Sequence, residues 1–353
     1  MIVMPNRNAL ARWQDFAGVR TIACGLVAAV MSMVMCGMAM GQIIPERTYY
    51  GVQRAIPVRL MVGEAEGIQA EIELLEPLTG RIVERAAVTP EQAKQVVDLA
   101  SLFPMIWKDS EPRLLYAQLK VEGKGVGSAL VLQPLLSPVY APRNDKSGAP
   151  MFPPEKDRAK ISSGIRAYVD KVVVIETSKG SITIGLRPDV APNTCWNFRQ
   201  LVEGGLYTDV VFHRIASLAG RQTADIVQTG DPAGTGQGGP GYYLDLEPSK
   251  LPHDFGVVSA ARLSDPNSGG SQFFIVLNRE GTAYLDGRHA AFGVVLDVGN
   301  GAEVVRSIAA TPVGPDNRPM EPPVIKGAKL VDAAPYGMGP GVAKDPLKRD
   351  KAR

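Results

Sequence analysis

Short apolar runs separated by turn residues fill the stretch from residue 47 to residue 134. Within residues 70–74 and 116–121, apolar and polar side chains alternate one by one, as in strands with one buried face. The strands expected from this pattern cover residues 56–62, 69–75, 114–121 and 128–132. We therefore predict a mainly antiparallel, β-sandwich-like accessory domain over residues 42–136. It has no His, Cys or carboxylate cluster suited to catalysis, so its expected role is interaction or spacing.

Helices are expected at three places. Thr89-Pro90-Glu91 combines an N-cap residue, a first-turn proline and an acidic residue, which predicts a helix over residues 91–102. In the second half of the chain, strands at 171–177 and 181–186 are joined by a glycine turn and form a hairpin. A helix follows Pro192 and stops at Gly204-Gly205, and another lies around residues 302–309. The hydrophobic pattern of this half indicates a β fold without distinguishing one barrel from another.

Two segments have the composition of unstructured chain. Residues 137–168 contain five prolines among Asn, Asp, Lys, Ser and Gly, and we interpret them as a Pro-rich linker. Residues 333–353 contain five basic and two acidic residues with little apolar content after Met338, which predicts a disordered tail.

The N-terminal 41 residues have the pattern of an export signal. Arg7, Arg12 and Arg20 precede a stretch of 21–45 that has no charged residue, and Ala39-Met40-Gly41 supplies small residues for cleavage. The apolar core is longer than usual for a signal peptide, so an uncleaved membrane anchor over residues 21–41 is the alternative. Either alternative predicts an exported protein, periplasmic or extracellular.

The net charge limits the kinds of partner that the protein is expected to bind, and the cysteine content limits its possible disulfides. The formal net charge is +2, and it falls to zero without the first 41 residues, which hold three Arg and one Asp. This near-zero net charge argues against binding to nucleic acid or to an anionic membrane surface. Contact with a membrane is therefore expected only through a possible N-terminal anchor. After cleavage only Cys195 remains of three cysteines, so no internal disulfide is expected, and its place on an apolar helix face predicts a core residue.

Four short motifs occur in a fixed order in the second half. They are Val-Phe-His-Arg-Ile at 211–215, Val-Gln-Thr-Gly-Asp-Pro at 227–232, Gly-Gly-Ser-Gln-Phe-Phe-Ile at 269–275 and Tyr-Leu-Asp-Gly-Arg-His-Ala-Ala-Phe-Gly at 284–293. Together they resemble the cyclophilin family of peptidyl-prolyl cis-trans isomerases over residues 169–332. The resemblance implies an eight-stranded antiparallel barrel capped by two helices, so the chain as a whole is expected to be mainly β.

The resemblance also implies the chemistry. Rotation about an X-Pro amide is opposed by the loss of resonance, about 18–20 kcal/mol, and it needs neither a cofactor nor a metal because no bond is broken. By resemblance, Arg214 donates to the proline nitrogen as it becomes pyramidal, and Gln228 holds that arginine. The resemblance assigns peptide binding to Phe274, Gln272, Leu285, His289, Ile226, Ala261, Arg262 and Tyr284. His213 and His253 have no ligand-like spacing and are expected to be structural or exposed.

One insertion and three substituted positions depart from the family pattern. Twelve residues separate Ile215 from Gln228, a longer insertion than usual, and Asp225 stands where the family has a pocket phenylalanine. An acidic group beside an apolar pocket would weaken binding of the proline ring unless it points away, and Leu218 of the insertion offers an apolar replacement. Arg262 replaces an asparagine, and Tyr284 a frequent tryptophan.

Two functions of different classes follow from this reading. The first is an isomerase that acts on X-Pro bonds of proline-containing polypeptide clients outside the cytoplasm and assists their folding. The alternative is a non-catalytic scaffold or chaperone that binds proline peptides through a degenerate site. A hydrolase lacks a nucleophile–base pair in the sequence, and the glycine-rich run 230–239 lacks the Lys-Ser/Thr ending of a phosphate loop. The sequence leaves the clients and the oligomeric state open.

Overall fold

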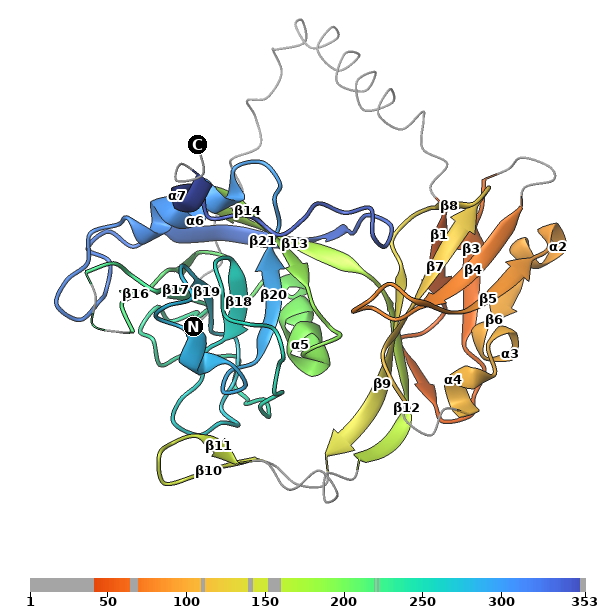
Figure 1. The fold of residues 1–353 in the computed structure, drawn as a ribbon, viewed down its shortest axis with the longest axis horizontal. Coiled ribbons are helices and arrows are strands. Elements are labelled where there is room, and N and C mark those ends of the chain that lie inside the picture. The colour runs from red at the N-terminus through yellow and green to blue at the C-terminus, as the bar shows by residue number, and fades with distance from the viewer. Residues whose placement is uncertain are drawn as a thin grey trace, which may run out of the picture. The chain divides into compact units, whose positions relative to one another are not determined.

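A computed structural model of the chain describes residues 41–63, 69–108, 112–138, 142–151, 160–218, 220 and 222–349 (Figure 1). The predicted export signal therefore lies outside the described residues except for Gly41. Among the residues that are described, no helix is both long and apolar enough to cross a membrane.

Two antiparallel sheets enclose the core of the N-terminal half. The smaller sheet pairs β1 (Gln42–Pro45) and β6 (Val96–Asp98) with the central β3 (Pro57–Met61). The larger sheet has the order β2 (Tyr49–Gly51), β12 (Lys160–Val169), β9 (Leu130–Pro138), β7 (Leu115–Val121), β4 (Ala70–Leu75) and β5 (Ile82–Val88), with β8 (Lys124–Gly125) beside β7. The alternation is visible in β3, where Val58 and Leu60 are buried and Arg59 is exposed. The mainly β, sandwich-like prediction for this half is confirmed.

The single helix predicted over residues 91–102 is wrong. The structure has three short helices, α2 (Pro90–Ala93), α3 (Leu99–Leu102) and α4 (Met105–Lys108), and β6 separates the first two. Thr89 is the N-cap, as expected, and it also forms a capping box with Gln92. The helix ends early because Val96 and Val97 pair with β3, and Asp98 then caps a new helix by accepting a hydrogen bond from Ala100 N at 3.0 Å.

The predicted linker over 137–168 is wrong for its last part. Residues 160–169 form β12, which pairs with β9 along its length and buries Ile165 and Ala167 in the N-terminal core. The chain then enters the C-terminal half after a single residue, Asp170. Within the proline-rich stretch, β10 (Arg143–Asn144) and β11 (Pro150–Met151) form a small hairpin. Pairing with β9, which is distant in sequence, determines the structure of residues 160–169. The proline content of the segment does not indicate this pairing.

The C-terminal half is a nine-membered antiparallel sheet that closes on itself. Its order is β15 (Val210–Val211), β21 (Val324–Asp332), β13 (Lys171–Thr177), β14 (Gly180–Leu186), β20 (Ala291–Val295), β18 (Val257–Ala260), β19 (Phe273–Val276), β17 (Ile226–Thr229) and β16 (Arg214–Ala216). The two ends of this order, β15 and β16, are separated along the chain only by Phe212 and His213. They are halves of one bent strand, so the sheet is the predicted eight-stranded barrel.

Two longer helices pack on the barrel, α5 (Pro192–Glu203) and α6 (Gly301–Ala309) (Figure 1). Cys195, Phe198, Phe212 and Phe292 are buried in the same apolar core as the inward side chains of the strands. The thiol of Cys195 donates to Phe292 O at 3.1 Å, and burial raises its pKa well above the usual value. Cys195 is therefore a core residue, as its helical position predicts.

The side of α5 that is turned away from the barrel core packs against the N-terminal sheets. Trp196 lies between the guanidinium of Arg166, 4.6 Å from its ring centre, and the ring of Tyr168 at 5.0 Å. Arg199 donates from Nη1 to Val169 O at 2.7 Å and stacks on Tyr168. Aromatic and cation–π contacts of this kind join the two halves into one folded body.

The prediction of a disordered tail is wrong for residues 333–349. Tyr336 donates its hydroxyl to Pro77 O at 2.7 Å and packs edge-on against Tyr116 of the N-terminal half. Further on, Ala343 is buried in the barrel core, and Arg306 of α6 holds Asp345 in an ion pair of 2.6 Å. The chain ends its described part in α7 (Pro346–Arg349). A few anchoring residues order this segment although its average composition is polar.

Candidate active site

Arg214 and Gln228 lie opposite each other on β16 and β17. This register places Arg214 Nη1 3.1 Å from Gln228 Oε1, to which it donates. Gln228 in turn donates from Nε2 to Gln272 Oε1 at 3.0 Å. The three side chains form a line of hydrogen bonds that fixes the guanidinium at the barrel surface. The structure brings together the residues to which the resemblance assigns catalysis and the edge of the site.

Gln272 is fixed from behind by the glycine-rich loop 230–239. Its Nε2 donates to Gly236 O at 3.0 Å and to Gly238 O at 2.8 Å. The loop is organised by the fully buried Asp231, whose carboxylate accepts hydrogen bonds from four donors. These donors are Ala233 N at 2.7 Å, Gly236 N at 2.6 Å, Gly238 N at 3.0 Å and Thr235 Oγ1 at 2.9 Å.

Asp231 is a supporting residue that the sequence analysis missed. Burial alone would raise the pKa of its carboxyl, but the hydrogen bonds from the loop outweigh burial and lower the pKa to about 2. The carboxylate therefore stays ionised at neutral pH and holds the loop around it. The available signal was the Gly-Asp-Pro sequence directly before a run of glycines, which offers backbone N–H groups to a carboxylate.

An apolar cluster lies near Arg214, because Gln228 is paired with Arg214 on one side and with Phe274 of this cluster on the other. Ile226, Phe274 and Leu285, the last on the 3₁₀ turn η2 (Ala283–Leu285), belong to one buried cluster. His289 stands edge-on to Phe274 with ring centres 5.7 Å apart, and its Nδ1 lies 3.1 Å from Ala260 O. Burial lowers the pKa of His289 to about 4, so the ring is neutral at pH 7. A neutral ring donating through Nδ1 fits the predicted role as a pocket wall better than that of a base.

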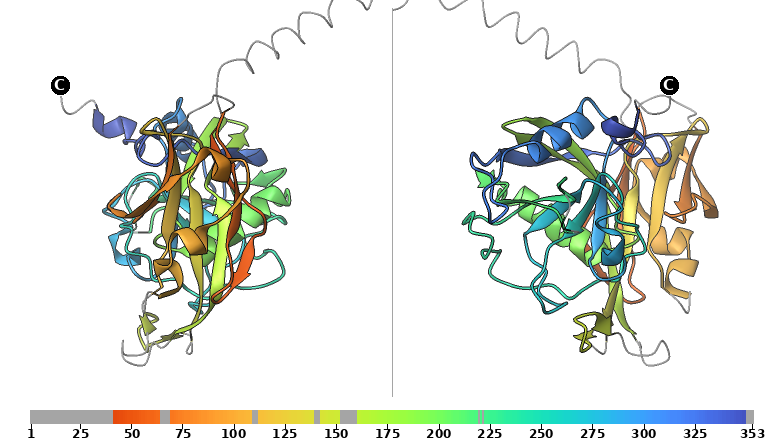
Figure 2. Two further views of the ribbon diagram at one scale, coloured as in Figure 1. Left: turned by 90° about the vertical axis from the view of Figure 1, so that its right-hand side faces the viewer. Right: turned by 60° about the vertical axis from the view of Figure 1, so that its left-hand side comes forward.

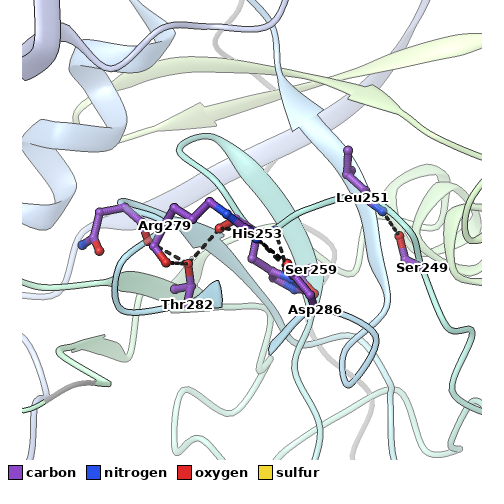
Figure 3. Close-up of polar contacts among 8 residues, drawn as sticks. Ser249, Leu251, His253, Ser259, Arg279, Thr282 and Asp286 are labelled. Carbon is purple, nitrogen blue, oxygen red and sulfur yellow. Dashed lines mark hydrogen bonds and ion pairs between the residues drawn. The ribbon is translucent and has the colours of Figure 1, made fainter. Parts of the chain in front are cut away.

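A polar cluster of His253, Ser259, Arg279 and Asp286 was not foreseen (Figure 3). His253 lies with Nε2 2.9 Å from Ser259 Oγ and Nδ1 3.0 Å from Asp286 Oδ1. Arg279 completes the cluster by an ion pair of 2.6 Å with Asp286. This Ser–His–Asp order resembles a hydrolase triad, but Ser259 and His253 are both 0% exposed, so no substrate reaches them. The ring of His253 is stacked 6.0 Å from that of Phe274, and the cluster supports the pocket wall.

Asp225 does not turn its charge toward the proline pocket. The carboxylate accepts hydrogen bonds from Leu218 N and Asn278 Nδ2, both at 2.7 Å, and it lies against Gly281. Asp225 thus links the inserted loop to the turn that precedes η2. Leu218 of that loop packs against the cluster that contains Phe274, which is the apolar replacement that the sequence suggested.

A cavity of about 440 Å³ continues the site on the side of Gln272. Ala261, Arg262, Tyr242 and Tyr243 are among the residues that line it. Arg262 does not extend into solvent, because it donates from Nε to Arg288 O at 3.0 Å and from Nη1 to Leu263 O at 2.9 Å. Tyr284 is 53% exposed at the rim. Of the residues with predicted peptide-binding roles, Gln272, Ala261 and Arg262 line this cavity, whereas Ile226, Phe274 and Leu285 belong to the buried apolar cluster.

Comparison with known proteins identifies the class. A sequence profile described as cyclophilin type peptidyl-prolyl cis-trans isomerase/CLD matches residues 172–330. Peptidyl-prolyl cis-trans isomerase-like 1 of Aspergillus fumigatus is 39% identical over 165 residues, 45% of this chain and 95% of the relative. The isomerase ppi1 of Schizosaccharomyces pombe is 37% identical over 164 residues, 45% of this chain and 98% of the relative. The chain belongs to the cyclophilin-type isomerase family.

Solved structures include a similar chain. A cyclophilin-type isomerase of Cryptosporidium parvum, crystallised in the presence of the dipeptide Ala-Pro, is 31% identical, with a TM-score of 0.40 over 45% of this chain and 98% of that chain. On the strength of its family, this protein is a cyclophilin-type peptidyl-prolyl cis-trans isomerase. In the described part of the chain, no group of His, Cys, Asp and Glu side chains is arranged to hold a metal ion.

Proposed function

We propose that the protein is an exported prolyl isomerase that assists the folding of proline-containing clients in the periplasm or outside the cell. Export is supported by the basic residues before an uncharged apolar stretch and by the small residues that end at Gly41. If the segment is not cleaved, residues 21–41 anchor the enzyme to the membrane. The N-terminal sheets then localise the enzyme or recruit clients.

Within the site, we assign catalysis to Arg214 and Gln228. The observation that carries the assignment is the hydrogen bond of 3.1 Å that fixes Arg214 near the apolar cluster that contains Phe274. In the twisted amide the proline nitrogen becomes pyramidal and gains a lone pair, so a donor already fixed in place stabilises this state more than the planar one. A guanidinium can donate to Gln228 with one N–H and to the substrate with another.

The remaining residues bind the peptide in this proposal. Phe274, Leu285, His289 and Ile226 hold the proline ring, and Ala261, Arg262, Gln272 and Tyr284 contact the flanking chain. Purified residues 42–353 should speed cis-to-trans conversion of an X-Pro peptide without added metal or nucleotide. A folded sample that binds the peptide but leaves the slow uncatalysed rate unchanged would favour the scaffold function instead.

Export is tested separately from turnover. Residues 1–60 fused to a reporter that is active only outside the cytoplasm should give reporter activity, and the mass of the mature chain distinguishes cleavage after Gly41 from anchoring. A fusion whose reporter stays inactive in the cytoplasm would remove the extracytoplasmic part of the proposal and leave the isomerase activity untouched.

A further inference from the structure

The proline-rich stretch between β9 and β12 contains an ordered hairpin that no family resemblance covers. Asp145 stabilises its turn, since Oδ1 accepts hydrogen bonds from Ser147 N at 2.8 Å and Ala149 N at 2.9 Å. Gly148 supplies the left-handed conformation that the turn needs, with φ of 81°. Residues 142–151 therefore present a defined surface instead of a random linker.

This hairpin docks on the isomerase barrel next to the active site. Asn144 donates from Nδ2 to Ser264 O, and Asn267 donates from Nδ2 to Pro142 O at 2.9 Å. Pro142 is buried at this contact. Figures 1 and 2 show β10 and β11 on the side of the barrel strands opposite α6. Segments more than 100 residues apart in the sequence are thus joined beside the peptide site.

The loop that receives the hairpin also forms one wall of the cavity. Arg262, Leu263 and Ser268 line the cavity of about 440 Å³ beside Gln272. Ser264 O accepts from Asn144 of the hairpin and also from Arg262 Nη1 at 3.2 Å. The hairpin therefore holds the same carbonyl group that positions Arg262.

Arg262 links the hairpin contact at Ser264 to the loop that contains Arg288. Its Nε donates to Arg288 O, one residue before the pocket residue His289. Arg288 is also close enough to Asp145 to help lower the pKa of that carboxyl, whose main cause is the hydrogen bond from Ser147. The hairpin, the 262–268 loop and the loop at Arg288 are consequently parts of one continuous surface.

We propose that the hairpin 143–151 extends the peptide groove and makes the enzyme prefer long, extended polypeptide segments over short X-Pro peptides. Among the described residues, those that line the cavity and form the apolar pocket do not include a hairpin residue. A short peptide bound at the proline pocket therefore has no need of the hairpin. A longer client that runs through the cavity past Leu263 next contacts the hairpin. The proposed preference for long segments presupposes the isomerase activity proposed above.

The test compares peptides of two lengths. A tetrapeptide and two decapeptides, extended from it on either the N-terminal or the C-terminal side of proline, are assayed with residues 42–353. Wild type should show a higher kcat/KM for the decapeptide extended on one side, mainly through KM. The double variant Asn144→Ala, Asn267→Asp removes both docking donors but keeps the Asn267 oxygen that accepts from Leu246 N.

In the double variant, the ratio of kcat/KM for the favoured decapeptide to kcat/KM for the tetrapeptide should fall by roughly three- to tenfold. This is the range expected for the loss of one or two hydrogen bonds, here those that hold the hairpin against the barrel. Tetrapeptide turnover should change by less than about twofold, because Arg214 and the pocket remain in place. Asn144→Ala alone should reduce the advantage of the longer peptide by a smaller factor. This single variant keeps the test usable if the double variant folds poorly. Lys146→Ala, at an exposed position in the same turn, serves as the matched control and should keep the full advantage.

Two results would overturn the proposal. A wild-type enzyme that turns over the tetrapeptide but gains nothing from either extension has no extended groove. Equal losses on the tetrapeptide and the decapeptides in the docking variants would mean that the hairpin acts only through the stability of the barrel. Absence of tetrapeptide turnover in the wild type would instead contradict the isomerase function, so the two failures are distinguishable.

Discussion

Asp231→Asn should weaken both the fold and the catalytic site, because this carboxylate organises the loop that holds Gln272. The change keeps the size of the side chain and removes its charge. The amide oxygen can replace Oδ2, which accepts from three donors of the loop, but the NH₂ group then faces Ala233 N, which has lost its acceptor. Losing the charge-assisted hydrogen bond from Ala233 N, and leaving that donor unpaired, predicts a loss of about 2–3 kcal/mol in the free energy of unfolding.

The catalytic effect follows from the chain of hydrogen bonds. Asp231 holds Gly236 and Gly238, their carbonyls hold Gln272, and Gln272 in turn holds Gln228 beside Arg214. A shift of the loop is therefore passed to Arg214, the proposed catalytic donor, and misplacement of such a donor by up to about 1 Å lowers the rate roughly ten- to hundredfold. We expect this loss in kcat, with KM changed less, in an assay that follows cis-to-trans conversion of a short X-Pro peptide.

The pH dependence of stability gives an independent readout. The folded pKa of Asp231 is about 2, below its ordinary value of 3.8. A lowered folded pKa means that the ionised carboxylate stabilises the fold above pH 4 and that this contribution is lost as pH falls toward 2. Denaturant unfolding of the Asn variant should lack this part of the acid dependence.

The control for this prediction is Asp245→Asn, which makes the same chemical change at an exposed aspartate. It should leave stability and turnover near the wild-type values. Asp231→Asn with full kcat and reduced stability would refute the positioning of Arg214 through the loop. An unchanged stability would refute the larger claim that the buried carboxylate holds the loop at all.

The barrel was predictable because its motifs specify both fold and register. Placing Arg214 opposite Gln228 requires two neighbouring strands in one alignment, and the motif order already implied those strands. The supporting residues were harder to foresee. His253 and Asp286 are 33 residues apart in sequence, and only the closed barrel brings them together behind Phe274. Spacing along the chain carries no signal for such a contact.

The errors in the sequence analysis have a common physical origin. Composition averaged over a segment predicted a linker and a disordered tail, yet each segment is ordered by a few specific anchors. Ile165 and Ala167 bury one face of β12, and Asp345 pairs with Arg306. Local propensity was likewise overridden when Val97 joined β3 and ended the helix that Thr89 begins. Tertiary partners far away in sequence decide these segments.

Three further changes test the site, the tail and the junction. Arg214→Ala should lower kcat about 10²–10³-fold with the circular dichroism spectrum unchanged, and Arg214→Lys should recover little, since an ammonium lacks the fixed fork. Arg306→Met leaves the buried Asp345 without its ion pair, so unfolding should need about 3 kcal/mol less and the tail should be cut faster by protease. Trp196→Ala removes the ring between Arg166 and Tyr168, and we expect a loss of about 2–3 kcal/mol from lost packing and cation–π contact. Because Trp196 lies on the helix face toward the N-terminal sheets, turnover of a short peptide should stay normal while denaturant unfolding separates into two steps. A single unfolding step at the wild-type denaturant concentration would show that these ring contacts do not join the two halves.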